Sequence, residues 1–280
     1  MHRNSIVGDY AVYAEQLVSS GIQGNVVLAE CFHTEEKLVA KITKLNSKRQ
    51  KERYTNEVAV LKVLTSCSKV VQIKASYQYE KVGVTILEKM PFDLMSIIEN
   101  ELLKSTQHRM NIFTKVCYAV KECHDRGVAH LDIKPENILV TKDLRDVKLC
   151  DFGNSAILNA SGLVKPSGGT LVYASPELLS KQKVNGKLAD IWSLGILFHV
   201  LMTDFWPYRS AESSSLKTLI KEGNITPNHT LTEKQLQFLH TMLQVKPEDR
   251  CDIDTLCQHL EKKKASKLKF WYSKSLPVSV

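Results

Sequence analysis

Two short segments in the middle of this chain constrain its fold and chemistry more than any other feature. Residues 130–137 read His-Leu-Asp-Ile-Lys-Pro-Glu-Asn, and residues 151–153 read Asp-Phe-Gly after a short hydrophobic run. Each segment alone is a weak signal, because Asp-Phe-Gly is an ordinary loop tripeptide and a His-x-Asp sequence can simply cap a turn. In this order and at this spacing, the two segments together are a strong signal.

The residue types in these segments match the requirements of phosphoryl transfer. That reaction needs a carboxylate to accept a hydroxyl proton, an amide and a second carboxylate to hold divalent cations, and a cation to balance the phosphate charge. These groups are supplied, in that order, by Asp132, Asn137, Asp151 and Lys134.

The set resembles the signature of the eukaryotic protein kinases of the serine/threonine type, and the resemblance covers nearly the whole chain. Upstream, residues 38–41 match the strand that carries a phosphate-binding lysine, and Glu57 matches its partner on the following helix. Downstream, residues 169–177 resemble the end of the activation segment of that family. Residues 190–195 match the helix that anchors the catalytic loop, and Arg250 matches the buried partner of the glutamate at the segment's end.

The resemblance implies an α+β fold with two lobes, a small β-rich N-lobe with one main helix and a larger, mostly helical C-lobe. The residue periodicity agrees with this division. Alternating or β-branched runs at residues 25–29, 37–42, 70–75 and 82–87 surround one helical stretch at about residues 51–64. From Leu94 onward, apolar residues recur with the helical period.

These patterns set the expected domain boundaries. We expect the N-lobe at residues 1–87, a hinge at residues 88–93, the C-lobe at residues 94–260 and a basic tail at residues 261–280. Pro91 fits the hinge, because proline prevents a helix from starting earlier.

By resemblance, ATP binds between the lobes. A glycine-rich loop at residues 19–26 would cover the phosphates, although Ser19 stands where the family has its first glycine. Val39 replaces the usual alanine and would narrow the adenine pocket, which Leu94 would also line. The implied ATP-binding residues are Ser19, Gly21, Gly24, Val26, Val39, Lys41, Glu57, Leu87, Glu88, Met90 and Leu139.

The resemblance also assigns the catalytic roles, with ATP and Mg²⁺ as the implied cofactors. Asp132 would accept the hydroxyl proton, and Lys134 would stabilise charge on the transferring phosphoryl group. Asn137 and Asp151 would bind Mg²⁺ through oxygen atoms, and Thr170 would hydrogen-bond back to the base and the lysine. His130 would pack in an apolar column between the lobes rather than act in acid–base catalysis.

The expected substrates are serine and threonine hydroxyls of proteins. Lys134 lies two residues after the catalytic aspartate, and residues 169–177 read Gly-Thr-Leu-Val-Tyr-Ala-Ser-Pro-Glu, which are both features of serine/threonine kinases. Two alternatives stay open. One is a pseudokinase scaffold that binds nucleotide without efficient transfer, suggested by Ser19, Val39 and Leu131. The other is a small-molecule kinase of related fold.

Leu131 is the clearest departure from the family pattern. Most members have an arginine here that pairs with a phosphate on the activation segment, whereas leucine has no donor. The Mos-type kinases share the leucine, so the change is compatible with activity. We therefore expect activity without phosphorylation of the activation segment at Ser161, Ser167 or Thr170. In the alternative, Lys165 or Lys148 replaces the arginine.

Composition adds limits on partners and location. The formal net charge is +8, but no basic-aromatic motif accompanies it, so we expect a solvated basic surface and no specific nucleic-acid site. The tail at residues 261–280 could contact an anionic surface, or it could simply pack or fray. No window has the apolar length of a signal peptide core or a bilayer span. We expect a cytoplasmic or nuclear protein.

The seven cysteines form no Cys-x-x-Cys pair, and in a reducing compartment they resemble small buried hydrophobic residues. Cys150 is the exception, because it precedes Asp151 and would border the nucleotide site. An apolar neighbourhood would raise its thiol pKa and nearby cations would lower it, so an inert and a reactive thiol both stay open.

Overall fold

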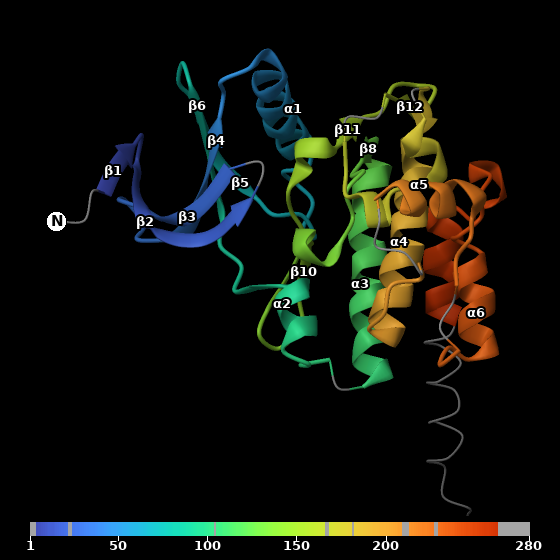
Figure 1. Ribbon diagram of the computed structural model, residues 1–280. Coiled ribbons are helices and arrows are strands. Elements are labelled where there is room, and N and C mark those ends of the chain that lie inside the picture. The colour runs from blue at the N-terminus through green and yellow to red at the C-terminus, as the bar shows by residue number, and fades with distance from the viewer. Residues whose placement is uncertain are drawn as a thin grey trace, which may run out of the picture.

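A curled antiparallel sheet makes up most of the first lobe, and most of the helices lie to one side of it (Figure 1). The computed structural model describes residues 4–21, 24–103, 105–165, 168–180, 182–208, 213–226 and 229–262. Within these residues the sheet has six strands in the order β1-β2-β3-β4-β6-β5. The strands are β1 (Asn4–Val7), β2 (Tyr10–Gly21), β3 (Gly24–Cys31), β4 (Lys37–Lys44), β5 (Ile73–Gln78) and β6 (Val82–Glu88).

Strand β4 shows how the sheet divides its side chains between two faces. Successive side chains of a strand point to opposite faces. Leu38 and Ala40 belong to the apolar core on one face of the sheet, whereas Val39 belongs to the core that continues into the second lobe. Lys41 follows Val39 by two residues and therefore shares its face. The alternation thus directs the lysine toward the second lobe.

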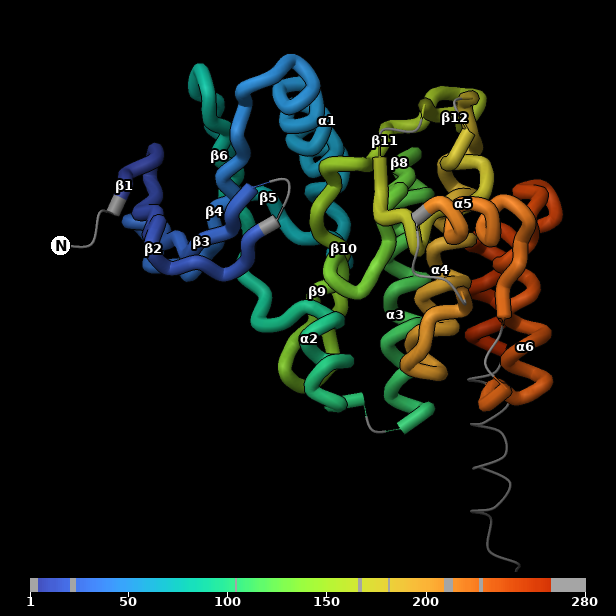
Figure 2. The backbone as a smooth tube through the Cα atoms, viewed as in Figure 1, coloured from blue at the N-terminus to red at the C-terminus, as the bar shows by residue number. Residues whose placement is uncertain are grey.

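Helix α1 (Lys48–Val63) lies beside the sheet, on the side that faces the second lobe (Figures 1 and 2). It begins with a capping box, in which Ser47 Oγ accepts from the Gln50 amide and Gln50 Oε1 accepts from the Ser47 amide. Its buried residues recur with the helical period. They are Tyr54, Glu57, Val60 and Leu61.

The second lobe is built around α4 (Gly186–Thr203), which is buried on nearly all sides. A helix that is apolar all round belongs in a core. It packs against α3 (Thr106–Asp125), as both views show (Figures 1 and 2). The remaining helices are α2 (Leu94–Glu99), α5 (Ser213–Glu222), α6 (Glu233–His240) and a last stretch at residues 253–262. The expected two-lobed α+β architecture is confirmed.

Short strands between the lobes hold the loops that carry the two sequence segments. The catalytic loop connects β8 (Val128–Ala129) to β9 (Ile138–Val140), and β9 pairs with β10 (Val147–Leu149). Asp151 follows β10 closely. The pairing of β11 (Ala156–Ile157) with β8 closes the loop that follows Asp151. Residues 130–137 and 151–154 are thereby brought together. The other short strands are β7 (Phe92–Asp93), β12 (Leu163–Val164) and β13 (Val184–Asn185).

Several expected element boundaries differ from the structure. The apolar run at residues 70–75 was expected to be one strand, but Val70 makes only an isolated bridge to Leu149, and β5 begins at Ile73. Val70 and Val71 are instead buried in the core, at 0% and 3% exposed. Strands β1 and β2 were not among the runs expected to form strands. No helix within the described ranges is long and apolar enough to cross a membrane, and residues 263–280 of the expected basic tail lie outside those ranges.

A buried ion pair fastens the end of the activation segment to the second lobe. Arg250 donates from Nη1 and Nη2 to the Glu177 carboxylate at 2.7 and 2.8 Å, and from Nη1 to the Leu188 carbonyl at 2.8 Å. Its guanidinium also lies over the Trp192 ring, 5.1 Å from the centroid. The paired geometry and the added carbonyl contact satisfy most of the guanidinium donors.

Replacing Arg250 with alanine should therefore destabilise the protein strongly. The Arg250 side chain is 0% exposed, and removing one partner of a buried pair typically costs roughly 3–5 kcal/mol. Chemical denaturation would measure the free energy of unfolding. The control is Arg145→Ala, which removes a pair with Asp143 at the surface and should change that free energy little. Equal losses in the two variants would contradict the interpretation.

Candidate active site

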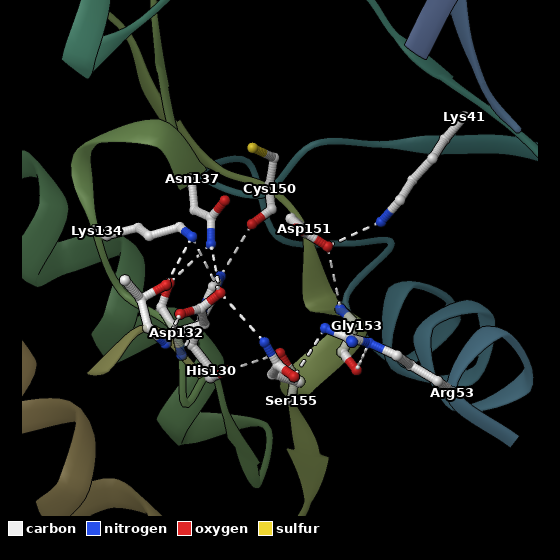
Figure 3. Close-up of polar contacts among 12 residues, drawn as sticks. Lys41, Arg53, His130, Asp132, Lys134, Asn137, Cys150, Asp151, Gly153 and Ser155 are labelled. Atoms are coloured by element: carbon white, nitrogen blue, oxygen red, sulfur yellow. Dashed lines mark hydrogen bonds and ion pairs between the residues drawn. The ribbon is translucent and has the colours of Figure 1, made fainter. Parts of the chain in front are cut away.

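Lys41 is held between two carboxylates at the junction of the lobes. Its Nζ lies 2.5 Å from Glu57 Oε1 and 2.8 Å from Asp151 Oδ1. Strand β4, helix α1 and the loop after β10 therefore meet at one ammonium group, and Figure 3 shows the contact with Asp151. Burial lowers the pKa of Lys41, but the two carboxylates outweigh burial and raise that pKa above its ordinary value. Lys41 is thus a permanent cation that links the lobes.

The two carboxylates respond differently to this environment. Burial raises the pKa of Glu57 above its ordinary value, since the attraction of Lys41 only partly offsets the loss of water. Burial also opposes the charged form of Asp151, but Lys41 outweighs it and holds the pKa of Asp151 below its ordinary value. Of these two carboxyl groups, that of Asp151 is therefore the more readily ionised.

The backbone at Asp151 turns its carboxylate toward Lys41. The residue adopts left-handed angles, φ 57° and ψ 73°, which aspartate tolerates better than most residues. It begins the single turn η2 (Phe152–Asn154), and its Oδ1 accepts from the Gly153 amide at 3.4 Å. Lys41 and this amide both use Oδ1, so the carboxylate has a second oxygen to offer a cation.

Asp132 lies at the centre of a second polar cluster. Its Oδ1 accepts from the Thr170 amide at 2.8 Å, and its Oδ2 accepts from Asn137 Nδ2 and Asn154 Nδ2, each at 3.2 Å. Lys134 Nζ lies 3.6 Å from the same Oδ2. These donors fix the carboxylate in one orientation.

The amide of Asn137 has a defined orientation. Its nitrogen donates to the Asp132 backbone carbonyl at 2.8 Å as well as to the Asp132 carboxylate. Both partners only accept, so the nitrogen must face them and the oxygen is directed elsewhere. An amide oxygen in this position is a suitable ligand for a hard cation.

The end of the activation segment lies directly on the catalytic loop. Lys134 Nζ donates to Thr170 Oγ1 at 2.7 Å, next to the contact between the Thr170 amide and Asp132. Gly169 makes this approach possible. Its φ is +130°, and a Cβ at this position would lie 3.0 Å from the Leu131 carbonyl oxygen.

Asp190 anchors the catalytic loop from helix α4. The Asp190 carboxylate accepts from the backbone amides of His130 and Leu131 at 2.8 and 2.7 Å, and its Oδ2 lies 2.9 Å from His124 Nε2. Leu131 itself has φ +63°, which is unusual for a residue other than glycine. The two amide bonds hold the backbone in this conformation.

His130 is committed to packing and to backbone contacts. Its ring lies 4.8 Å from the Phe152 ring, centroid to centroid, and is completely buried. Its Nδ1 accepts from the Asp132 amide at 3.3 Å, so we assign the ring hydrogen to Nε2, which lies 3.0 Å from the Cys150 carbonyl oxygen. Phe152 and Leu61 share one apolar core, and Ile73 packs against it, as expected for the column between the lobes.

The expected phosphate loop is the hairpin between β2 and β3. Ser19 pairs with Val26 and Gly21 with Gly24, whereas residues 22–23 lie outside the described residues. Gly24 has φ +145°, and a Cβ there would lie 2.1 Å from the Ile42 carbonyl oxygen. The approach of strand β4 therefore already requires glycine at this position.

The residues expected around the adenine fall into two groups. Val39 lies opposite Leu87 across β4 and β6, and each is 8% exposed, while Val26 and Leu139 pack partly buried on the same core. Leu94 was expected in this wall, but it is 0% exposed at the start of α2. That expectation is wrong, because a fully buried side chain presents no surface to a ligand.

Glu88, the first residue of the expected hinge, is fixed by its neighbours. Lys148 Nζ lies 2.7 and 2.8 Å from its two carboxylate oxygens, and the Gln72 amide donates to Oε1 at 2.8 Å. Met90, also expected at the nucleotide, is partly buried two residues later. Lys148 is therefore paired with Glu88, which disfavours it as a replacement for the missing arginine at position 131.

Leu131 joins an apolar cluster that includes the activation segment. This cluster, here called the Leu131 cluster, contains Ala129, Leu131, Val164, Val184 and Ala189, all buried. Strand β12, which carries Val164, pairs with strand β13, which carries Val184. At position 131, where most members of the family have an arginine for a cationic contact, this chain has a leucine that makes an apolar contact.

Two side chains in the site were not expected from the sequence. Arg53 Nε donates to the Gly153 carbonyl at 2.9 Å, and Arg53 Nη2 donates to Asn154 Oδ1 at 2.8 Å. Arg53 precedes Glu57 by four residues, which places both on one helix face and could have drawn attention to it. For Asn154, the only signal in the sequence is its position next to Asp-Phe-Gly.

Comparisons with known proteins agree with this geometry. A family model described as "Protein kinase domain" matches residues 13–260. The Schizosaccharomyces pombe protein "Protein kinase domain-containing protein ppk9" is 30% identical over 261 residues, covering 91% of this chain and 48% of that protein. "Probable serine/threonine-protein kinase MARK-C" of Dictyostelium discoideum is 29% identical, covering 90% of this chain and 33% of that protein.

A third relative is "Serine/threonine-protein kinase dkf-1" of Caenorhabditis briggsae. It is 27% identical over 263 residues, with coverage of 89% of this chain and 34% of the relative. The chain thus spans half or less of the length of these relatives.

The structure also predicts which cysteine reacts first with an electrophile. Burial raises the pKa of the Cys150 thiol far above its ordinary value, with Asp151 adding to the shift. Hydrogen bonding from Thr34 lowers the pKa of Cys31 below its ordinary value. Since the thiolate is the nucleophile, iodoacetamide at neutral pH should label Cys31 well before Cys150.

Mass spectrometry of peptides from partly labelled protein would measure the two rates. Protein unfolded in denaturant is the control, and there the two rates should converge. Faster labelling of Cys150 than of Cys31 in the folded protein, slowed by Mg-ATP, would contradict the inert assignment and support a reactive thiol at the nucleotide site.

Proposed function

This chain belongs to the protein kinase family, and we propose that it transfers the γ-phosphoryl group of ATP to serine and threonine hydroxyls of proteins. One observation supports the proposal most directly. Asp132, Lys134 and Thr170 form one hydrogen-bonded cluster, and Lys41 is bonded to Asp151 beside it. The groups that the reaction requires are therefore present together and oriented.

In the proposed reaction the acceptor oxygen forms a bond to the γ-phosphorus while the bond from that phosphorus to the bridging oxygen of ADP breaks. The acceptor proton passes to the Asp132 carboxylate. Three hydrogen bonds to that carboxylate support this role, since they hold it in place before the substrate arrives. Lys134 would neutralise charge on the transferring group.

Lys41 would bind the α- and β-phosphates, with Glu57 holding it in position. The raised pKa of Lys41 supports this role, because a permanent cation suits a polyphosphate. The adenine would lie against Val26, Val39, Leu87 and Leu139, with the backbone of Glu88 and Met90 at the proposed hinge of residues 88–93. The loop with Ser19, Gly21 and Gly24 would cover the phosphates.

The residues present fit a magnesium ion. Asn137 directs its amide oxygen away from Asp132, and Asp151 is an anion with a carboxylate oxygen beyond the one that Lys41 uses. Hard cations take such oxygen ligands. A bound Mg²⁺ would supply charge neutralisation at the phosphates, and these two residues would hold it.

A pseudokinase scaffold remains the second candidate, since Ser19 and Val39 depart from the family pattern. The observation against it is the intact set of contacts around Asp132 and Lys41. A small-molecule kinase is disfavoured by the activation-segment end, which is fastened by Glu177 and Arg250.

Replacing Asp132 with asparagine should lower turnover by roughly 10²–10⁴-fold, since general-base groups contribute about that much. Mg-ATP binding should stay nearly intact, whereas Asp151→Asn should abolish metal-dependent nucleotide binding. Transfer of labelled phosphate to a protein substrate and calorimetric titration with Mg-ATP would measure the two effects. Wild-type protein that binds Mg-ATP but transfers nothing, with Asp132→Asn indistinguishable from it, would favour the pseudokinase.

We further propose that activity does not require phosphate on the activation segment. Two observations support this. Leu131 carries no donor for a phosphate, and its cluster already joins Val164 of the segment to Val184 and Ala189 of the lobe. An apolar contact would thus order the segment where relatives with arginine use a charged one.

Phosphatase treatment should therefore leave the rate of the purified protein within a few-fold of its starting value. Mass spectrometry must confirm that residues 151–177 carry no phosphate, and a phosphorylated reference peptide is the control for the phosphatase. A tenfold or greater loss, roughly 1.4 kcal/mol of transition-state stabilisation, that rephosphorylation restores would contradict the proposal. The candidate acceptor Ser167 lies outside the described residues.

A further inference from the structure

Two side chains, those of Arg53 and Asn154, connect helix α1 to Asp132 without passing through Lys41. Arg53 reaches from α1 to the turn after Asp151 and donates to the Gly153 carbonyl at 2.9 Å, as its direction in Figure 3 shows. It also donates to Asn154 Oδ1 at 2.8 Å, and Asn154 Nδ2 donates to Asp132 Oδ2 at 3.2 Å. Asn154 thus lies between a cation of one lobe and a carboxylate of the other.

The chemistry of the partners fixes which way the Asn154 amide points. A guanidinium only donates hydrogen bonds, and an ionised carboxylate only accepts them. The amide oxygen must therefore face Arg53 and the amide nitrogen must face Asp132. Asparagine offers both functions on one short side chain, whereas aspartate lacks the donor and leucine lacks both.

The surroundings of Asn154 restrict its movement. The residue is 4% exposed, as is Asp132, and Arg53 is partly buried. A Cβ at position 168 would lie 3.0 Å from Asn154 Oδ1, so Gly168 leaves the space that the amide occupies. Hydrogen bonds in such a buried position are costly to leave unmade.

We propose that Asn154 is a positioning residue, which couples the location of helix α1 to the orientation of the Asp132 carboxylate, with Arg53 as its anchor. The inference rests on the proposed kinase function. A displacement of α1 would withdraw Arg53 from Asn154 and free the amide to rotate. Asp132 would then lose one of its donors, and no phosphate takes part in this coupling.

A purely structural role for Asn154 makes a different prediction for one variant. If Asn154 only fastens Arg53, then Asn154→Asp should lower the rate much less than Asn154→Ala, because a carboxylate binds a guanidinium at least as well and keeps Arg53 in place. If Asn154 positions Asp132, the same variant should be impaired. It keeps the contact with Arg53 but loses the donor to Asp132 and adds a like charge beside it.

The test compares Asn154→Asp and Asn154→Ala with wild-type protein in single-turnover phosphoryl transfer. Both variants should lower the rate of the chemical step by roughly 10- to 100-fold, since small misplacements of a reacting group have effects of this size. Affinity for Mg-ATP, measured by calorimetric titration, should stay within a few-fold of wild type, because Lys41 and Glu57 are untouched. A loss of nucleotide affinity equal to the loss of rate would overturn the inference.

A double-mutant cycle tests whether Arg53 acts through Asn154. Arg53→Ala should slow the wild-type reaction but have little further effect on Asn154→Ala, and Arg53→Lys should restore part of the rate. The matched control is Asn56→Ala. Asn56 also lies on α1 and donates to the Ser155 carbonyl at 2.8 Å, but Ser155 donates onward to the His130 carbonyl and not to the Asp132 carboxylate. Its effect should be additive with that of Asn154→Ala.

The possible outcomes separate this inference from the proposed function. Wild-type protein that transfers no phosphoryl group overturns both. Active wild-type protein with an unimpaired Asn154→Asp variant overturns the positioning role alone, and additive effects of Arg53→Ala and Asn154→Ala overturn the anchor. Thermal unfolding of each variant would show whether it is folded. If Asn154→Ala does not fold, the test rests on Asn154→Asp, whose side chain has nearly the same shape as that of asparagine.

Discussion

The conformation of residues 130–132 depends on one buried carboxylate. Asp190 is completely shielded from solvent, and an unpaired charge in such a place is strongly unfavourable. The amides of His130 and Leu131 and the ring of His124 make its burial possible. The same bonds hold Leu131 in its left-handed conformation, so that the next residue, Asp132, meets its donors. The hydrogen bonds that make the burial of Asp190 on α4 possible thus also fix the conformation of the loop.

Helix α1 contributes to both parts of the site from a single face. Glu57 reaches Lys41, and Arg53, one turn earlier, reaches Gly153 and Asn154. In the proposed function, the first contact positions the lysine that would bind the phosphates, and the second supports the carboxylate that would accept the proton. Because both contacts start from one helix, the Lys41 cluster and the Asp132 cluster share a common mechanical support.

The sequence singled out Lys41, Asp132 and Asp151, because phosphoryl transfer restricts which groups can serve at such positions, and their roles are part of the proposed function. The helical second lobe could also be predicted, since long segments with the helical period fit few other structures. The prediction that Leu94 lines the adenine pocket was wrong because an apolar residue can belong to a pocket wall or to the core. The sequence pattern alone does not distinguish the two. The run at residues 70–75 failed for the same reason. No sequence pattern singled out Asn154, since its proposed role rests only on tertiary contacts.

The apolar character of the Leu131 cluster has a consequence for how the protein responds to its surroundings. Salt screens contacts between charges, whereas it hardly weakens the burial of leucine and valine. Hydrophobic association instead weakens on cooling. A contact between charges on the activation segment would weaken as the ionic strength rises. The packing of Leu131 with Val164 and Val184 instead weakens as the temperature falls, so the order of the segment depends on temperature. The segment would be insensitive to ionic conditions and more easily loosened in the cold.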